Sequence, residues 1–229
     1  DKTIYAVFVR NQLAYLSTGI GIVAIDLEKH EVRDTYIIGS TGNKIKVTGV
    51  TADAHFFYAA TEEGLKKAAV SNTNLADFRN WQTETNGLAA GPVQSVVTAQ
   101  NNVIAEKNDS LFKLNGANWD FLYRDGWDIK NISVSGDKIL LSETQNTSGR
   151  IIVLSTSGSV TATIQQPDFI VSPGQALFFQ NNYWIADSVA GLSKYTGSAF
   201  EQYVPNSPPS VASGSMDVFN KKIYAAAGA

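Results

Sequence analysis

Few side chains in this chain of 229 residues have the type and spacing that catalysis requires. It contains two histidines, His30 and His55, and no cysteine. His30 lies in the charged turn Glu28–Glu31, and His55 precedes the apolar run Phe56–Tyr58. Isolated histidines in such places are usually solvated turn or strand-end residues, so we expect neither a serine-type triad nor a histidine-rich metal site. The lack of cysteine excludes disulfides and thiolate ligands.

Paired acids are the other candidates for chemistry, at Glu62-Glu63 and at Asp125 and Asp128. A glycosidase needs two carboxyl groups that face each other across a cleft, whereas neighbouring acids in turns usually serve solubility. Gly19-Ile20-Gly21 resembles a glycine-rich phosphate loop, but no helix follows it, and these glycines fit a tight turn better. We therefore predict a protein that is not an enzyme, without catalytic, cofactor or metal residues. Its binding residues are not assigned.

The overall charge argues against several partners. The formal net charge is −3 and the isoelectric point about 5.4, so a basic surface for nucleic acid is not expected. Charged residues make up 17% of the chain, below the usual share of about 25%. Such a composition is typical of extracytoplasmic all-β proteins. No run of 18 apolar residues occurs, which predicts a chain that does not span a membrane.

A repeated unit positions these residues. Each unit has an apolar strand, a turn rich in Asn, Asp or Gly, a second apolar strand, a small-residue turn, a third strand and a more polar fourth strand. The first turns are anchored at Asn11, Asp53, Asn101, Gly136, Asn181 and Asn220. Their mean spacing, about 42 residues, matches the period of four-stranded propeller blades. One helical turn or two are expected only within Thr73–Arg79.

The strand patterns favour blades over a sandwich. Gly21–Leu27 is apolar on both of its alternating faces, as expected of a strand between two neighbouring blades. In Glu31–Ile38 the alternation predicts Glu31, Arg33 and Thr35 on one face and Val32 and Tyr36 on the other, typical of a half-solvated outer strand. Trp81 and Trp119 are expected to fill the space between blades, with stacking on a sugar as the alternative.

The predicted fold is therefore an all-β β-propeller of four-stranded antiparallel blades. We expect one propeller domain over 1–229, with about five complete blades and a partial sixth. The predicted blade units are approximately 1–39, 40–85, 86–125, 126–165, 166–207 and 208–229. Because the last unit has only two strands, the pattern suggests a piece of a larger propeller.

One stretch is specific enough to indicate a family. Ala14–Gly39 reads AYLSTGIGIVAIDLEKHEVRDTYIIG, and a weaker echo follows at Phe57–Thr61, Gly64–Ala68 and Asn74–Trp81. These segments resemble the N-terminal β-propeller region of PorZ-type proteins of the type IX secretion system. The resemblance implies a non-enzymatic protein of the cell surface, outer membrane or periplasm. It implies a binding and scaffolding role in secretion and cargo attachment beside a sortase-type protease, with lipopolysaccharide as a further candidate partner.

Two other classes stay open at this point. Extracytoplasmic sensor propellers of hybrid two-component regulators use similar short blades, often with a Gly-Leu turn such as Gly64-Leu65 or Gly191-Leu192. A propeller that degrades polysaccharide would need acids that converge at the mouth of its central channel. Because one fold hosts all three classes, the site must decide among them.

Overall fold

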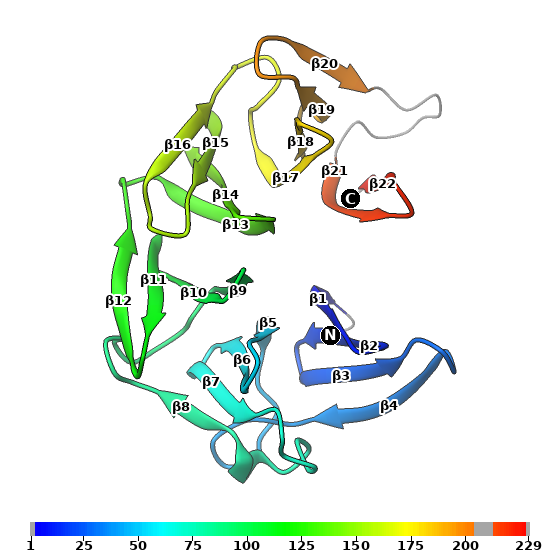
Figure 1. Cartoon of the computed structure of the whole chain (residues 1–229), viewed down its shortest axis with the longest axis vertical. Coiled ribbons are helices and arrows are strands. Elements are labelled where there is room, and N and C mark those ends of the chain that lie inside the picture. The colour runs from blue at the N-terminus through cyan, green and yellow to red at the C-terminus, as the bar shows by residue number, and fades with distance from the viewer. Residues whose placement is uncertain (1–2, 204–212, 228–229) are drawn as a thin grey trace. The chain divides into compact units, whose positions relative to one another are not determined.

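The computed structural model describes residues 3–203 and 213–227 as a series of four-stranded antiparallel sheets (Figure 1). The chain divides into two compact units, 1–123 and 124–229. In every sheet the strands pair in chain order, as in the blades of a propeller. Five sheets have four strands and one has two, which confirms the predicted blade composition.

The first unit contains three blades. Blade 1 consists of β1 (Ile4–Arg10), β2 (Leu13–Thr18), β3 (Gly21–Asp26) and β4 (Glu31–Tyr36). Blade 2 consists of β5 (Val47–Ala52), β6 (Phe56–Thr61), β7 (Gly64–Ala69) and β8 (Gln82–Glu84), and a 3₁₀ turn, η1 (Phe78–Asn80), precedes β8. Blade 3 consists of β9 (Ser95–Ala99), β10 (Asn102–Lys107), β11 (Ser110–Asn115) and β12 (Asn118–Tyr123).

The second unit contains two full blades and a pair of strands. Blade 4 consists of β13 (Asp128–Ser135), β14 (Lys138–Gln145), β15 (Ser148–Leu154) and β16 (Val160–Ile164). Blade 5 consists of β17 (Pro173–Phe179), β18 (Asn182–Asp187), β19 (Gly191–Tyr195) and β20 (Phe200–Tyr203). The last pair is β21 (Ser213–Phe219) and β22 (Lys222–Ala227). The predicted boundary at 207/208 lies outside the described residues.

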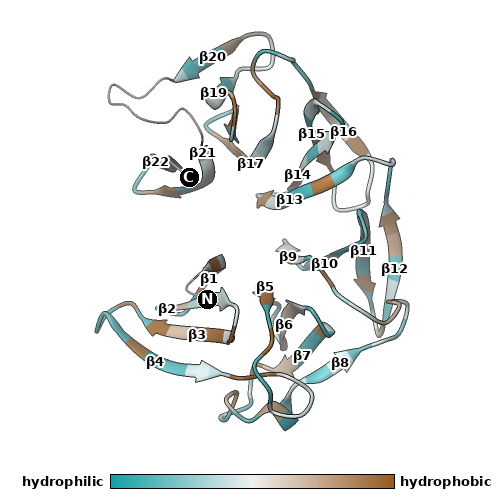
Figure 2. Cartoon of the chain, turned by 180° about the vertical axis from the view of Figure 1, so that it is seen from behind, coloured by the Kyte–Doolittle hydropathy of each residue, from teal (hydrophilic) through white to brown (hydrophobic). Residues whose placement is uncertain are grey.

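Burial follows the position of each strand within its blade. β6 has neighbouring blades on both sides within the first unit, and all of its residues after Phe56 are buried. β4 is an outer strand, and its first four residues are exposed. Figure 2 shows the same contrast within blade 1, where β3 is mostly hydrophobic and β4 mostly hydrophilic. Inner strands thus supply the core, where each buried aliphatic side chain contributes roughly 1.5–3 kcal/mol.

The anchor turns adopt the backbone that hairpins require. Asn11 and Gln12 have φ of 49° and 62°, and Asn181 has φ of 60° after Gln180 at 49°. Two consecutive residues with positive φ form a type I′ turn, whose twist matches that of the paired strands. Asparagine tolerates this conformation better than most residues, which explains its presence at Asn11, Asn181 and Asn220.

Of the one or two helical turns expected within Thr73–Arg79, the structure has one, the 3₁₀ turn η1, which begins at Phe78 and ends at Asn80. Polar side chains compete for the backbone donors that a longer helix would use. The Asn72 carboxamide oxygen accepts from the Asn74 N–H at 2.9 Å, and the Asp77 carboxylate accepts from the Arg79 N–H at 3.0 Å. The Trp81 indole also donates to the Leu75 carbonyl at 2.9 Å, which fixes the loop against the core.

Candidate functional site

A cleft of about 480 Å³ opens between blades 1 and 2 in the first unit. It lies where the β1–β2 turn, β2, β4, β6 and the segment after β7 meet. Its lining combines aromatic rings, two arginines and short polar side chains: Arg10, Asn11, Leu13, Tyr15, Arg33, Asp34, Tyr36, Phe57, Val70, Asn72, Thr73 and Leu75. Its volume is within the range of about 300–1,000 Å³ that is typical of small-molecule sites.

Three aromatic side chains form the floor of this cleft. Tyr15 is 6% exposed, Tyr36 7% and Phe57 4%. The ring of Tyr15 lies 5.1 Å from that of Phe57 and 6.5 Å from that of Tyr36. Because the rings pack against one another and the core, their faces are already covered. The floor therefore offers edges and hydroxyl groups rather than a free aromatic surface.

A β-bulge in β4 places Arg33 in the cleft. In the β3–β4 ladder Ala24 pairs with Asp34 and Ile25 with Val32, so Arg33 is the extra residue. A bulge breaks the strict alternation of faces and re-aims the side chain. Arg33 consequently lines the cleft together with Tyr36. Val32 pairs with Ile25 and Tyr36 with Ile22, an odd number of steps apart on β3, so the predicted placement of Val32 and Tyr36 on one face is wrong.

The two arginines of the cleft differ in how they are held. The Arg10 guanidinium donates to the Asp53 carbonyl oxygen at 2.7 Å and lies 5.6 Å above the Phe57 ring. Arg33 is exposed and forms no hydrogen bond or ion pair with any residue that the structure describes. The Asp34 carboxylate accepts from the Thr35 backbone N–H at 2.7 Å. Arg10 is thus anchored, whereas Arg33 can reorganise toward a ligand.

Both tyrosine hydroxyls remain protonated at neutral pH. Burial raises the pKa of Tyr15, an effect that the charges of Arg33 and Arg10 oppose. Burial, together with the neighbouring Tyr15 and Asp34, raises the pKa of Tyr36 to about 12. Neither hydroxyl has a hydrogen-bond partner among the described residues. The cleft thus contains two unpaired tyrosine hydroxyl donors, open to its solvent, beside two positive charges.

The candidate histidines lie apart from this cleft. His30 is exposed in the β3–β4 turn with φ of 57°. His55 is exposed before β6, where its backbone N–H donates to the Asp53 carboxylate at 2.7 Å. In the described part of the chain, no group of three or more His, Cys, Asp or Glu residues could hold a metal ion.

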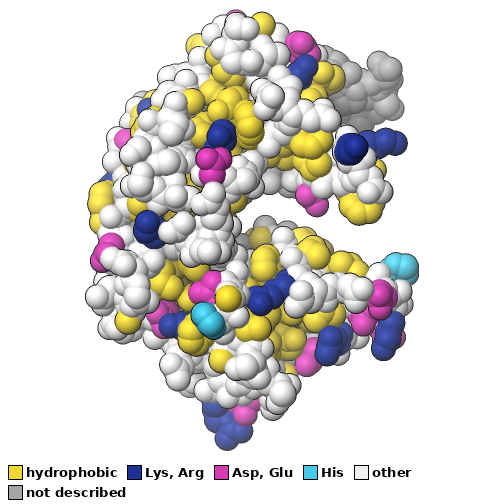
Figure 3. Space-filling model, viewed as in Figure 1, with side chains coloured by type: hydrophobic (Ala, Val, Ile, Leu, Met, Phe, Trp, Pro, Cys, Tyr) yellow, Lys and Arg dark blue, Asp and Glu magenta, His cyan; other side chains and the backbone are white. Residues whose placement is uncertain are grey.

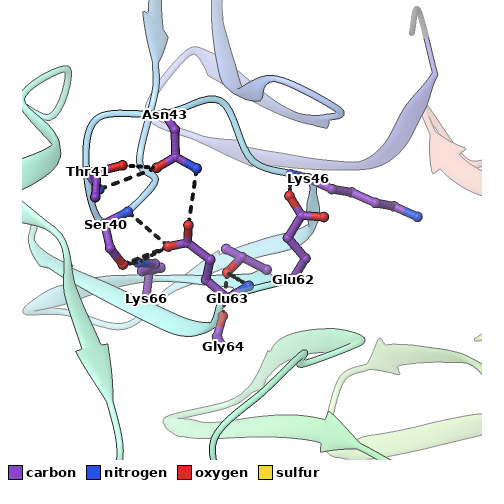
Figure 4. A network of polar contacts seen from close by, with 9 residues as sticks. Ser40, Thr41, Asn43, Lys46, Glu62, Glu63, Gly64 and Lys66 are labelled. Carbon is purple, nitrogen blue, oxygen red and sulfur yellow. Dashed lines mark hydrogen bonds and ion pairs between the residues drawn. The ribbon is translucent and has the colours of Figure 1, made fainter.

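The acids Glu62 and Glu63 belong to a polar network between the segment after β4 and the β6–β7 turn (Figure 4). The Glu63 carboxylate accepts from the Ser40 hydroxyl at 2.7 Å and the Asn43 amide at 3.3 Å. It also pairs at 2.8 Å with the Lys66 ammonium, whose side chain is 1% exposed. Glu62 turns away and accepts from the Lys46 backbone N–H at 3.0 Å.

The Glu63 carboxylate is ionised and paired with donors of this network. Burial opposes its ionisation, but hydrogen bonds from Lys66, Ser40 and Asn43 outweigh that effect and lower the pKa of Glu63 to about 2. A carboxylate held in this way is a poor general acid or base near neutral pH. The network therefore holds the segment after β4 against the β6–β7 turn, which is a structural role.

The second pair of acids diverges. Asp125 forms an ion pair with Arg150, which also pairs with the buried Glu143 at 2.8 Å and lies 3.9 Å over the Trp127 ring. Asp128 is exposed and lies 3.5 Å from the Lys130 ammonium. Different cations hold the two aspartates, which is unlike the facing carboxyl groups of a glycosidase.

The predicted packing role of the tryptophans is confirmed. Trp81 is 6% exposed and belongs to the core shared by blades 1 and 2. Trp119 is 2% exposed and meets Tyr58 edge-on at 6.3 Å, in the core shared by blades 2 and 3. Neither indole is free to stack on a sugar.

Sequence reasoning missed the cleft itself. Its residues come from five segments, and periodicity alone does not show which of them meet. The one available signal was the repeated proximity of aromatic and basic residues, as in Arg33 with Tyr36 and in Arg10 with Tyr15. The bulge that brings Arg33 onto this surface has no signature in the alternation of β4.

The fold and the comparisons agree on the class of protein. The blades described above define a β-propeller. Residues 1–82 match the family model described as the PorZ N-terminal beta-propeller domain of the type IX secretion system. The resemblance drawn from Ala14–Gly39 and its echo is therefore confirmed over that segment. No curated protein sequence matches the chain.

Solved structures of propellers are also similar to this chain. The extracellular domain of a putative hybrid two-component system from B. thetaiotaomicron gives a TM-score of 0.71 at 12% identity, over 97% of this chain and 31% of that one. The computationally designed Ika8 protein gives 0.64 at 11% identity, over 98% of this chain and 68% of that one. These likenesses show the fold alone.

A structure of PorZ from Porphyromonas gingivalis, an essential surface component of its type IX secretion system, is also similar. Its TM-score is 0.46 at 12% identity, over 100% of this chain and 44% of that one. The chain thus spans less than half the length of PorZ and about a third of the sensor domain. Within residues 3–203 and 213–227, no helix has the length and apolarity that a membrane-spanning segment requires.

Proposed function

We propose that this chain is a non-enzymatic β-propeller that acts outside the cytoplasm, at the cell surface, as a binding and scaffolding module in type IX protein secretion and cargo attachment. The observation that carries the proposal is the match of residues 1–82 to the PorZ N-terminal propeller model. Its partners are proteins of the secretion and attachment machinery, including a sortase-type protease. Lipopolysaccharide is a further candidate partner.

The arrangement of charge supports a binding role rather than catalysis. Two acids with little exposure, Glu63 and Glu143, are each paired with a cation of the same blade. On the face drawn in Figure 3, described basic side chains are scattered, and several lie beside acidic ones. Such a surface suits recognition by shape and local polar contacts more than recognition of nucleic acid.

Co-purification tests this proposal. The full-length protein, tagged and expressed in the bacterium that encodes it, would be isolated from solubilised outer membranes, with a tagged unrelated surface propeller as the control. We expect type IX components to be enriched over the control by mass spectrometry. A purification in which no type IX component exceeds the control would contradict the proposal.

A sensor propeller of a hybrid two-component regulator is the second candidate. The observation that favours it is the Gly64-Leu65 pair, which begins β7 directly after the turn at Glu62 and Glu63. The full-length reading frame separates the two candidates. A transmembrane segment followed by a histidine kinase domain would select the sensor, whereas a C-terminal sorting domain would select the secretion component.

A further inference from the structure

The cleft between blades 1 and 2 presents hydrogen-bond donors that the fold leaves unused. The Tyr15 and Tyr36 side chains are more than nine-tenths buried, and neither hydroxyl has a partner among the described residues. Neither hydroxyl oxygen is among the buried polar atoms that lack a partner, so each is open to the solvent of the cleft, where the acceptor atom of a ligand can replace water. The two hydroxyls therefore indicate an acceptor-rich ligand.

The charge of the cleft indicates the charge of that ligand. Arg10 and Arg33 contribute two positive charges and Asp34 one negative charge, so the lining has a net charge of one positive unit. Arg33 is unpaired within the described residues, and its planar guanidinium matches the two oxygens of a carboxylate. A monoanion satisfies both the charge and the donors.

The aromatic floor argues against recognition by stacking. The rings of Tyr15, Tyr36 and Phe57 are at most 7% exposed, and they pack against one another at tilted angles of 40° and 55°. A sugar or a base that binds by stacking needs a free ring face. The groups that remain accessible are the tyrosine hydroxyls and the guanidinium of Arg33, which suit a compact planar anion.

We propose that this cleft is a binding site for a carboxylate group, held by the Arg33 guanidinium and the hydroxyls of Tyr15 and Tyr36. Arg10, fixed over Phe57, supplies the second positive charge, and Asn72 and Thr73 also line the cleft. The source is either a free small organic acid or an acidic residue of a peptide. This proposal rests on the binding role proposed above and specifies a ligand for it, and it can be tested with the purified chain.

Titration calorimetry at low ionic strength tests this site. The probes are acetate and a short peptide capped at both ends with one central aspartate, and an asparagine peptide is the matched control. We expect at least one carboxylate probe to bind and the asparagine peptide not to bind. Binding of acetate alone assigns the site to small acids, and tighter binding of the aspartate peptide assigns it to peptides. Absence of binding by both carboxylates would overturn the proposal.

Three variants locate the binding. Arg33→Gln removes the unpaired cation and should weaken affinity at least roughly tenfold. Tyr36→Phe keeps the ring in the core and should weaken the affinity several-fold, because the hydroxyl is lost. Arg124→Gln removes the same charge from an exposed arginine that does not line the cleft, and should change little. Equal losses in Arg33→Gln and Arg124→Gln would show binding to general charge and overturn the assignment. Circular dichroism verifies that each variant is folded.

The sugar galacturonate and its neutral counterpart galactose complete the test. Equal affinities would show that hydroxyl groups rather than a carboxylate are recognised, which contradicts the inference. Because the purified chain is used, failure here leaves the secretion role standing. Conversely, carboxylate binding would persist even if no type IX component co-purified with the full-length protein.

Discussion

Individual buried charges determine how this propeller responds to pH. Glu106 in β10 is 3% exposed, and its carboxylate accepts from the Asp109 N–H at 3.1 Å. Burial raises the pKa of Glu106 from 4.5 to about 7, and it outweighs the hydrogen bond from the Asp109 backbone N–H, which lowers the pKa. Its neighbour Lys107 instead donates to the carbonyl oxygens of Gly91 and Pro92 at 2.8 and 2.7 Å. Glu106 therefore lacks the compensation that Glu63 receives from Lys66.

Glu106 should make the fold less stable as the pH rises. The folded state retains the proton more tightly than the unfolded state, so the full stability is present below pH 4.5 and is lost as the pH rises through about 7. The shift corresponds to a loss on the order of 3 kcal/mol. Glu106→Gln should remove this slope in urea unfolding measured between pH 4.5 and 8. The exposed variant Glu31→Gln is the control, and an unchanged slope in Glu106→Gln would refute the assignment.

Removing Glu63 should destabilise the fold more than removing Lys66, its partner in the ion pair. Glu63→Ala leaves the ammonium of Lys66, 1% exposed, without its carboxylate, and we expect a loss of about 3–5 kcal/mol. Lys66→Met replaces the cation with an apolar side chain of similar length, and Glu63 keeps its bonds to Ser40 and Asn43, so the loss should be smaller. Unfolding free energies at pH 7 compare the two variants. The reverse order would contradict this account of the network.

At the scale of the elements, a threonine-locked turn joins the second and third strands of blades 1 and 2. The Thr61 hydroxyl donates to the Gly64 carbonyl at 2.6 Å and accepts from the Glu63 N–H at 3.1 Å. The Thr18 hydroxyl makes the same two contacts with Gly21 and Ile20. Gly64 and Gly21 have φ of 122° and 128°, which side-chain-bearing residues rarely adopt. The pattern of a threonine followed by glycine three residues later thus has a structural cause.

Removing one of these hydroxyls should destabilise its blade. Thr61 is 0% exposed, and Thr61→Val keeps its volume but leaves the Glu63 N–H without this partner. We expect a loss of about 1–3 kcal/mol, measured by thermal or urea unfolding. Thr41→Val changes a hydroxyl in an exposed loop and should cost less. Equal stability of Thr61→Val and the parent chain would show that the hydroxyl does not lock the turn.

The same elements show how far sequence reasoning reaches. The positions of Asn11, Asn181 and Asn220 predict the hairpins because their backbone conformation is a local property. The Arg33 bulge is not local, since it depends on how β4 pairs with β3, and it was missed. The cleft depends on contacts between blades 1 and 2, so its residues could not be selected before the blades were placed side by side. The packing of Trp119 between blades was predictable because a large apolar side chain in a strand is enough to fill that space.

At the scale of the whole molecule, the central claim is a role in type IX secretion and cargo attachment. The most direct measurement is the distribution of secreted cargo after in-frame removal of residues 1–229 from the gene of the encoding bacterium, with complementation as the control. The account predicts that type IX cargo leaves the cell surface and accumulates in the medium or the periplasm, and that complementation restores it. Unchanged surface cargo in a strain that lacks the propeller would contradict the account.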